Sequence, residues 1–146
     1  MTIFPKQEVP QHILKDSVLA HVAAAYFSVG KQLEKKTNCS ATRGFILSTF
    51  RDAPTLNQNQ IATLLNLDRT VVHRSIRTMV RERLIAEKKA KSGRSILLSL
   101  TPKGTAYRKR LIEARVAADE KVRRALTQKD RDTLVRLLKQ IAELEL

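Results

Sequence analysis

Residues 68–83 read DRTVVHRSIRTMVRER, a segment in which arginines alternate with valine, isoleucine and methionine. Its five arginines and one histidine repel one another, so the segment is either disordered or matched by an anion. On a helical wheel with about 100° per residue, one side is apolar and consists of Val72, Ile76, Met79 and Val80. The opposite side carries Thr70, Arg74, Arg77 and Arg81. This separation predicts a helix with a buried apolar face and a basic outer face.

The basic face suits a nucleic acid. Asp68 is placed to cap the helix N-terminus, because its carboxylate can accept hydrogen bonds from free amides. Each like-charge pair one turn apart destabilises an isolated helix by a few tenths of a kcal/mol. A phosphate backbone reverses that effect and releases counterions, and the arginine fork can also bind guanine O6 and N7. The alternative is a basic face that is merely solvated.

The residues before this helix favour DNA binding. Residues 58–81, QNQIATLLNLDRTVVHRSIRTMVR, predict a helix, a tight turn and a second helix. Ile61, Ala62 and Leu65 would face inward and Leu67 would fill the turn. The small Ala62 allows the two helices to cross closely. In this helix-turn-helix layout the second helix is presented to the major groove.

A basic hairpin is predicted directly afterwards. Residues 84–89 and 95–100 are β-capable and flank a turn that contains Gly93. Its cations are Lys88, Lys89, Lys91 and Arg94. A two-stranded arm with cations at its tip suits the neighbouring minor groove or its phosphates. A helix-turn-helix followed by such an arm is a winged helix.

Further helices are expected on both sides. One covers about residues 11–36, with Leu14, Val18, Val22, Tyr26, Val29 and Leu33 along a stripe, and another covers 40–51. Thr101-Pro102 predicts the start of a helix that runs to about Ala125. Thr127 to Asp130 resembles a capping box before a last helix that reaches about residue 145. The predicted fold is mostly α with a small β-hairpin wing: a winged helix-turn-helix between N- and C-terminal dimerisation helices.

Composition agrees with one domain that binds a polyanion. The chain has 146 residues, 42% of them hydrophobic, and a formal net charge of +14. Residues 68–110 hold 13 Lys and Arg against three acids, so +10 of that charge lies in this region. No secretory signal or membrane-spanning run is visible, and the single Cys39 excludes an internal disulfide. The expected location is the cytoplasm, in association with the nucleoid.

Residues 55–104 resemble the MarR family of bacterial transcription regulators. The resemblance rests on TLNQNQIATLLNLDRTVVHRSIRTMVRERLI and on the LTPKG sequence, residues 100–104, that closes the hairpin. It implies a homodimer held together by the first helix and the last two. The family's recognition-helix contacts carry over to Arg69, Thr70, His73, Arg74 and Arg77, and its wing arginine to Arg94. Small aromatic or phenolic acids often act as effectors in this family, but no residue here assigns one.

The chain departs from the family pattern at two positions. Family members usually have Asp two residues before the wing arginine, where this chain has Ser92. They usually have glycine at the end of the recognition helix, where this chain has Arg83. The first change loosens the wing arginine and the second adds a cation. Together they predict a stronger non-specific component of DNA binding.

Several residues invite other interpretations. Cys39 is placed in a loop after the first helix, outside the position of known redox cysteines in relatives, and is interpreted as an incidental thiol. His12, His21 and His73 lack metal-ligand spacing, so we expect no metal site and interpret His73 as a DNA contact. Tyr26 and Tyr107 are interpreted as core or dimer contacts. No catalytic constellation or cofactor motif stands out, so an enzyme is not expected.

The favoured interpretation is a homodimeric, sequence-specific regulator that binds double-stranded DNA. The helix at about 68–82 would enter the major groove through Thr70, Arg74 and Arg77, with Arg81 on the backbone, and Lys89, Lys91 and Arg94 would reach the flanking groove. An architectural or silencer-opposing protein that coats DNA with weak sequence preference is the first alternative. A winged helix used as a protein-interaction module is the second. RNA binding stays open from charge alone, although the basic face lacks stacking aromatics.

Overall fold

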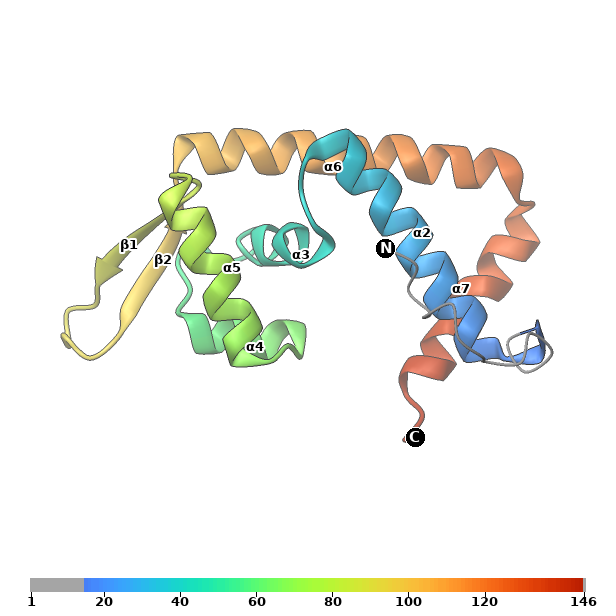
Figure 1. Ribbon diagram of the computed structural model, residues 1–146, viewed down its shortest axis with the longest axis horizontal. Coiled ribbons are helices and arrows are strands. Elements are labelled where there is room, and N and C mark those ends of the chain that lie inside the picture. The colour runs from blue at the N-terminus through green and yellow to red at the C-terminus, as the bar shows by residue number, and fades with distance from the viewer. Residues whose placement is uncertain (1–14, 146) are drawn as a thin grey trace, which may run out of the picture.

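A computed structural model of the protein describes residues 15–145. Its elements are α2 (Val18–Thr37), α3 (Ala41–Thr49), α4 (Gln58–Leu65), α5 (Arg69–Arg81), β1 (Ile85–Lys89), β2 (Ile96–Leu100), α6 (Pro102–Ala125) and α7 (Gln128–Ala142). Helices α3 to α5 and the hairpin gather beside the first half of the long α6, while α2 runs from α6 down toward α7, which follows the far end of α6 (Figure 1). The predicted winged helix with flanking helices is confirmed.

The core belongs to the winged helix. The side chains that are almost fully buried come from α3, α4, α5 and the hairpin: Ile46, Leu47, Ile61, Val72, Met79 and Ile85. Ala62 is also buried, whereas Leu65, Leu67 and Val80 are partly buried at the edge of this cluster. The apolar face predicted for residues 68–83 is therefore the face that packs. Burial of this face holds α5 with its basic side in solvent.

Local signals define both helices of the helix-turn-helix. Asn57 and Gln60 form a complete capping box, in which Gln60 N donates to Asn57 Oδ1 over 2.9 Å and Asn57 N donates to Gln60 Oε1 over 2.8 Å. Asn66 ends α4 in the left-handed region, with φ 49°. Leu67 N then donates to Ala62 O over 3.0 Å. The turn before α5 is thus set by short-range hydrogen bonds.

The wing is a two-stranded antiparallel hairpin whose register runs from Ile85 opposite Leu100 to Lys89 opposite Ile96. A one-residue bridge extends it: Leu56 N donates to Leu98 O over 3.0 Å, and Leu98 N donates to Leu56 O over 2.8 Å. This bridge ties the segment before α4 to the wing. Sequence analysis did not predict it, because a single bridging residue produces no periodicity.

The LTPKG sequence joins the wing, α6 and the end of α5. Thr101 caps α6 by accepting from Gly104 N over 2.9 Å, and its hydroxyl donates to Arg83 O over 2.7 Å. Lys103 Nζ donates to Glu82 O over 2.9 Å, at the negative end of the α5 dipole. Gly104 is buried against the backbone of Leu84. The motif therefore serves as a structural joint.

Two predictions about helix starts need refinement. The first helix was expected as one element over residues 11–36, but it is interrupted at Ser17: Lys15 and Asp16 are helical, and α2 begins at Val18, where the Ser17 side chain accepts from Ala20 N over 3.2 Å. Residues 11–14 lie outside the described part of the chain. At α7, Thr127 accepts from Asp130 N over 3.2 Å, but the Asp130 carboxylate accepts the Thr127 hydroxyl instead of the cap amide. Aspartate is one methylene shorter than the usual glutamate, and we attribute the incomplete box to that.

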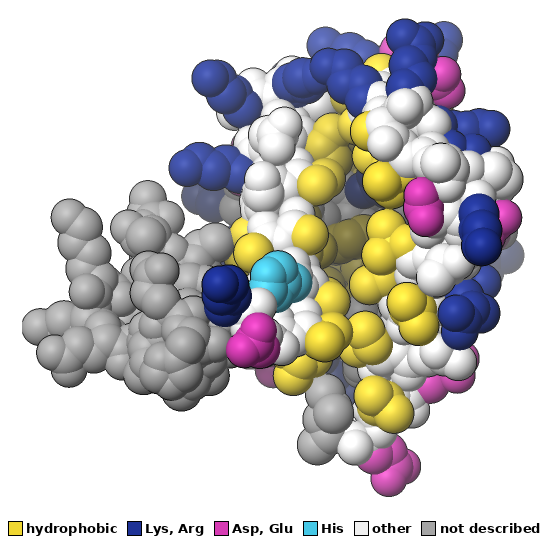
Figure 2. Space-filling model, turned by 90° about the vertical axis from the view of Figure 1, so that its right-hand side faces the viewer, with side chains coloured by type: hydrophobic (Ala, Val, Ile, Leu, Met, Phe, Trp, Pro, Cys, Tyr) yellow, Lys and Arg dark blue, Asp and Glu magenta, His cyan; other side chains and the backbone are white. Residues whose placement is uncertain are grey.

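The terminal helices expose a large apolar face. Side chains on α2, the second half of α6 and α7 are between 41% and 62% exposed: Val18, Leu19, Tyr26, Phe27, Val29, Val116, Val122, Leu134, Val135, Leu137 and Leu138. Figure 2 shows apolar side chains forming a band down this side of the molecule, with cations around it. Within residues 15–145, no helix is long and apolar enough to cross a membrane.

Arg83 occupies a strained backbone conformation. Its φ of 60° lies in the left-handed region, which suits the glycine that relatives have at this position. We expect Arg83→Gly to raise the free energy of unfolding by about 1 kcal/mol, measured by urea denaturation. Arg83→Ala removes the same charge but keeps the Cβ, so it should bring no such gain. Equal stability changes in the two variants would contradict the strain argument.

Candidate DNA interface

The outer face of α5 presents a row of exposed polar and basic side chains, here named the basic ridge: Thr70, Arg74, Arg77 and Arg81. The other side of the helix is anchored by Val72 and Met79, both 0% exposed, and by Ile76. Within residues 15–145, the guanidinium groups of Arg74 and Arg77 make no hydrogen bond or ion pair with the protein. Two exposed cations without a counter-ion among the described residues are suited to phosphates or base edges.

Thr78 and Arg81 interact along the ridge. Thr78 Oγ1 donates to Arg74 O over 3.1 Å, and Arg81 Nη2 donates to Thr78 Oγ1 over 3.3 Å. Arg81 is thereby held along the helix, whereas Arg74 and Arg77 extend without restraint from the protein.

The N-terminus of α5 is rigidly capped. Asp68 Oδ1 accepts from Thr70 N over 2.7 Å and from Val71 N over 3.3 Å. These hydrogen bonds lower the pKa of the Asp68 carboxyl, and the one from the Thr70 backbone has the largest effect. The Asp68 carboxylate caps the helix, and the exposed residues Arg69 and Thr70 come directly after it in the chain. The first turn therefore presents a cation and a hydroxyl from a fixed backbone.

Gln58 contributes to the interface from α4 and was missed by sequence analysis. Its Nε2 donates to Arg69 O over 3.4 Å, and its Oε1 accepts from His73 Nδ1 over 3.0 Å. The predicted site residue His73 is exposed beside the ridge and attached to α4 through this amide. Sequence periodicity does not predict this contact, because Gln58 and His73 are 15 positions apart and meet only when α4 packs against α5.

The wing carries the other predicted cations. Lys89 and Lys91 are exposed and Arg94 is exposed near the tip of the hairpin, which extends away from α6 as α5 does (Figure 1). Gly93, with φ 70°, closes the tip, where its N donates to Ala90 O over 2.8 Å. In the described part of the chain, neither the Ser92 hydroxyl nor the Arg94 guanidinium has a hydrogen-bond partner. Within the described residues, no hydrogen bond therefore fixes the orientation of the wing arginine.

Carboxylates near α5 are occupied elsewhere. Glu82, the C-cap residue of α5, forms an ion pair with Arg43 of α3. Its backbone oxygen also accepts from Lys103. The one acid at the C-terminal end of α5 is thus neutralised and does not reduce the positive field of the ridge.

Cys39 is buried in the loop between α2 and α3, and it is 6% exposed. Burial raises the pKa of its thiol, so the reactive thiolate is disfavoured. The neighbouring Tyr107 hydroxyl donates to Asn38 O over 3.0 Å and packs α6 against this loop. These observations agree with an incidental thiol and a structural tyrosine.

Of the other two histidines, His21 lies on α2, away from the interface. His21 Nδ1 donates to Ser17 O over 2.8 Å within the first turn of α2, and His12 lies outside the described residues. Tyr26 is half-exposed on α2 and makes an edge contact with Phe27, with ring centroids 5.6 Å apart. Among residues 15–145, no three histidine, cysteine or acidic side chains gather as a metal site would require.

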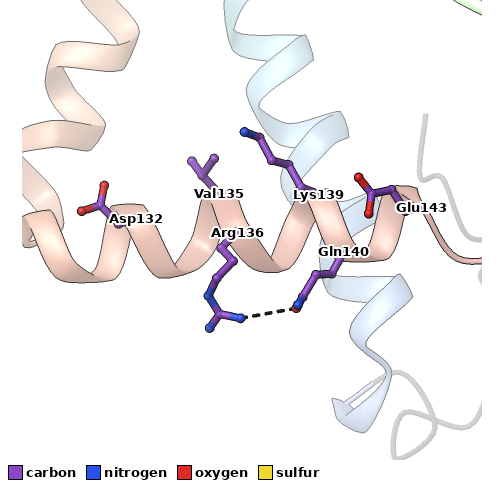
Figure 3. A pocket seen from close by; sticks show the side chains of 6 residues that line it. All are labelled: Asp132, Val135, Arg136, Lys139, Gln140 and Glu143. Carbon is purple, nitrogen blue, oxygen red and sulfur yellow. Dashed lines mark hydrogen bonds between the residues drawn. The ribbon is translucent and has the colours of Figure 1, made fainter.

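A hollow of about 420 Å³ lies along α7 (Figure 3). It is lined by six side chains of that one helix and its C-terminal cap: Asp132, Val135, Arg136, Lys139, Gln140 and Glu143. Arg136 Nη1 donates across it to Gln140 Oε1 over 3.4 Å. Because a single helix forms it and charged groups line it, we interpret this hollow as part of the exposed terminal surface.

Comparison with known proteins agrees with this geometry. The family model of the winged helix DNA-binding domain matches residues 46–104. No curated protein sequence matches the chain.

Solved structures of bacterial regulators share the whole fold. The transcriptional repressor CouR, solved bound to a 23-mer DNA duplex, is 23% identical with a TM-score of 0.80; the match covers 94% of this chain and 100% of CouR. A mutant MarR from E. coli is 19% identical with a TM-score of 0.69, and that match covers 93% of this chain and 98% of MarR. BpsR of Bordetella bronchiseptica, whose DNA binding is regulated by 6-hydroxynicotinic acid, is 17% identical with a TM-score of 0.72; the match covers 87% of this chain and 100% of BpsR.

The family match covers the end of α3, all of α4, α5 and the wing, and the start of α6, so it includes the basic ridge and the hairpin cations. The structural likeness extends to the helices on both sides. Residues 46–104 therefore match a winged helix DNA-binding domain, and the chain has the fold of the MarR-type transcription regulators.

Proposed function

We propose that the protein is a homodimeric regulator that binds specific double-stranded DNA sites in the bacterial cytoplasm, on the nucleoid. Helix α5 enters the major groove, where Arg69, Thr70, His73, Arg74 and Arg77 contact bases or adjacent phosphates. Arg81 holds the backbone, and Lys89, Lys91 and Arg94 reach the flanking groove. The observation that carries this proposal is the pair of unpartnered guanidinium groups, within the described residues, on a capped and buried recognition helix.

A genomic selection tests sequence specificity. Purified protein is incubated with sheared bacterial DNA at about 150 mM salt, and the retained fragments are sequenced. A pseudo-palindrome with half-sites one helical turn apart, about 34–36 Å, is the expected result. Retention without a shared motif would favour an architectural protein, and no retention would favour a protein-interaction module.

The proposed dimer rests on the apolar face of α2, α6 and α7. Large side chains there, such as Phe27 and Val135, stay about half-exposed in one copy. Interleaved terminal helices from a second copy would bury them, leaving about 40–101 as the DNA-binding region. Sedimentation at micromolar concentration should give twice the chain mass of 16.5 kDa. A 16.5 kDa particle would contradict the proposal, and Leu138→Glu should produce one.

The rigidity of the wing controls how strongly the protein binds DNA of random sequence. Because Arg94 lacks the carboxylate that relatives place at position 92, Ser92→Asp should restrain it and lower affinity for random DNA about threefold. Ser92→Asn, similar in size but uncharged, serves as the control and should leave that affinity unchanged. Competition with random duplex measures both. No change in the aspartate variant would remove this explanation of non-specific binding.

A small aromatic acid is proposed as an effector, supported by one contact between α3 and α6. The Arg115 guanidinium of α6 lies 5.6 Å from the ring centroid of Phe45 on α3. Cation and aromatic groups together suit an aryl carboxylate. Titration with hydroxylated benzoates should release bound DNA, and Arg115→Ala should weaken that release. Unchanged DNA binding at millimolar acid would end this proposal.

A further inference from the structure

The amide of Gln58 holds the imidazole of His73 in a defined state. Gln58 Nε2 donates to Arg69 O over 3.4 Å, so its Oε1 is the atom directed at His73 Nδ1, 3.0 Å away. An amide oxygen only accepts hydrogen bonds, so Nδ1 must carry the proton. In the neutral ring, the other nitrogen, Nε2, is then an acceptor with a free lone pair.

His73 lies where such an acceptor can meet a base. It is exposed in the first half of α5, the part of a recognition helix that contacts base edges. On the helical wheel it lies between Arg69 and Arg77. Its Nε2 makes no hydrogen bond within residues 15–145. No ionisable side chain of α4 competes for the ring, because Gln58–Leu65 contains none.

This inference rests on the proposed function. We infer that Gln58 is a positioning residue, which keeps Nε2 of His73 as a hydrogen-bond acceptor. That acceptor reads an exocyclic amino group of a base in the major groove. Cytosine N4 and adenine N6 are the donors there, whereas guanine and thymine present only acceptors at the matching edge. The pair therefore selects cytosine or adenine at one position of each half-site. If Gln58 is removed, the ring is free to place the proton on Nε2 and to donate to guanine or thymine.

The tautomer is tested on the free protein by ¹⁵N NMR at about pH 8.5, where imidazole is neutral. The signals of His73 are assigned from their loss in His73→Ala. The wild type should show the proton on Nδ1, and Gln58→Ala should show the proton on Nε2 or exchange between both nitrogens. Gln58→Glu keeps an acceptor oxygen and should restore the Nδ1 proton. A wild-type proton on Nε2 overturns the inference.

Base preference is tested by selection from a randomised duplex pool. The wild type should enrich cytosine or adenine at one position per half-site, by roughly tenfold over the other bases. Gln58→Ala should admit guanine or thymine there, and His73→Ala should lose the preference while the rest of the motif persists. An unchanged motif in His73→Ala overturns the base-reading role. If the wild type selects no motif at all, both the proposed function and the base-reading role of His73 are overturned. In that case the NMR spectrum still decides the tautomer of His73.

Discussion

Gly104→Ala should lower the free energy of unfolding by at least about 3 kcal/mol, a large part of the about 5–15 kcal/mol that stabilises a typical domain. A Cβ at position 104 would lie 2.0 Å from Leu84 O and 2.9 Å from Leu84 C. Those atoms are backbone, so no rotamer change relieves the overlap. Leu84 O also accepts from Thr101 N over 3.1 Å, and the cap of α6 would be displaced with it. Urea denaturation followed by circular dichroism measures the loss.

Gly44→Ala is the matched control for this prediction. Gly44 is also buried in a helix, but an added Cβ would meet only the flexible Arg115 side chain, at 3.6 Å. Because alanine favours helices over glycine by about 1 kcal/mol, this variant should be as stable as the wild type or more so. Equal stability of the two alanine variants would mean that α6 shifts freely from the wing, against the joint described for LTPKG.

Replacing Arg74 and Arg77 together by alanine should weaken binding to the selected DNA site by at least about a hundredfold. Both guanidinium groups are exposed on the basic ridge and lack partners among the described residues, so their removal deletes contacts without breaking the fold. If both bind phosphates, the slope of log affinity against log salt falls by about 1.8. If instead one of the two arginines binds guanine, its removal costs about 1–3 kcal/mol of discrimination between guanine and the other bases at that one base pair. Fluorescence anisotropy at several salt concentrations separates the two cases.

The double variant Lys109→Ala, Arg124→Ala is the control for charge alone. Both residues are exposed on α6 outside the ridge, and their removal lowers the net charge by the same two units. Affinity and salt slope should change only slightly, because salt screens charges more than about 10 Å from the DNA. A similar loss in both double variants would show that overall charge drives binding, which would favour the architectural alternative.

Much of the DNA-binding region follows from short-range signals that tertiary contacts reinforce. The wheel of residues 68–83 predicts which side of α5 is buried, and Val72 and Met79 are fully buried as expected. Asp68 and Thr101 cap their helices as predicted, since a cap bonds amides two or three positions ahead. The predicted site residues of the ridge and the wing are exposed on α5 and on the hairpin. Their contacts with DNA stay predictions.

The amino-acid sequence by itself determined the helix-turn-helix, the hairpin, most helix starts and the basic ridge, because each depends on periodicity or on hydrogen bonds between near neighbours. Tertiary structure alone decided the Leu56–Leu98 bridge, the Gln58–His73 contact and the close approach of Gly104 to Leu84. These involve residues between 15 and 42 positions apart, whose distance depends on how the elements pack. The left-handed backbone of Arg83 belongs to the same class, because packing of Leu84 and Thr101 imposes it against the residue's own preference.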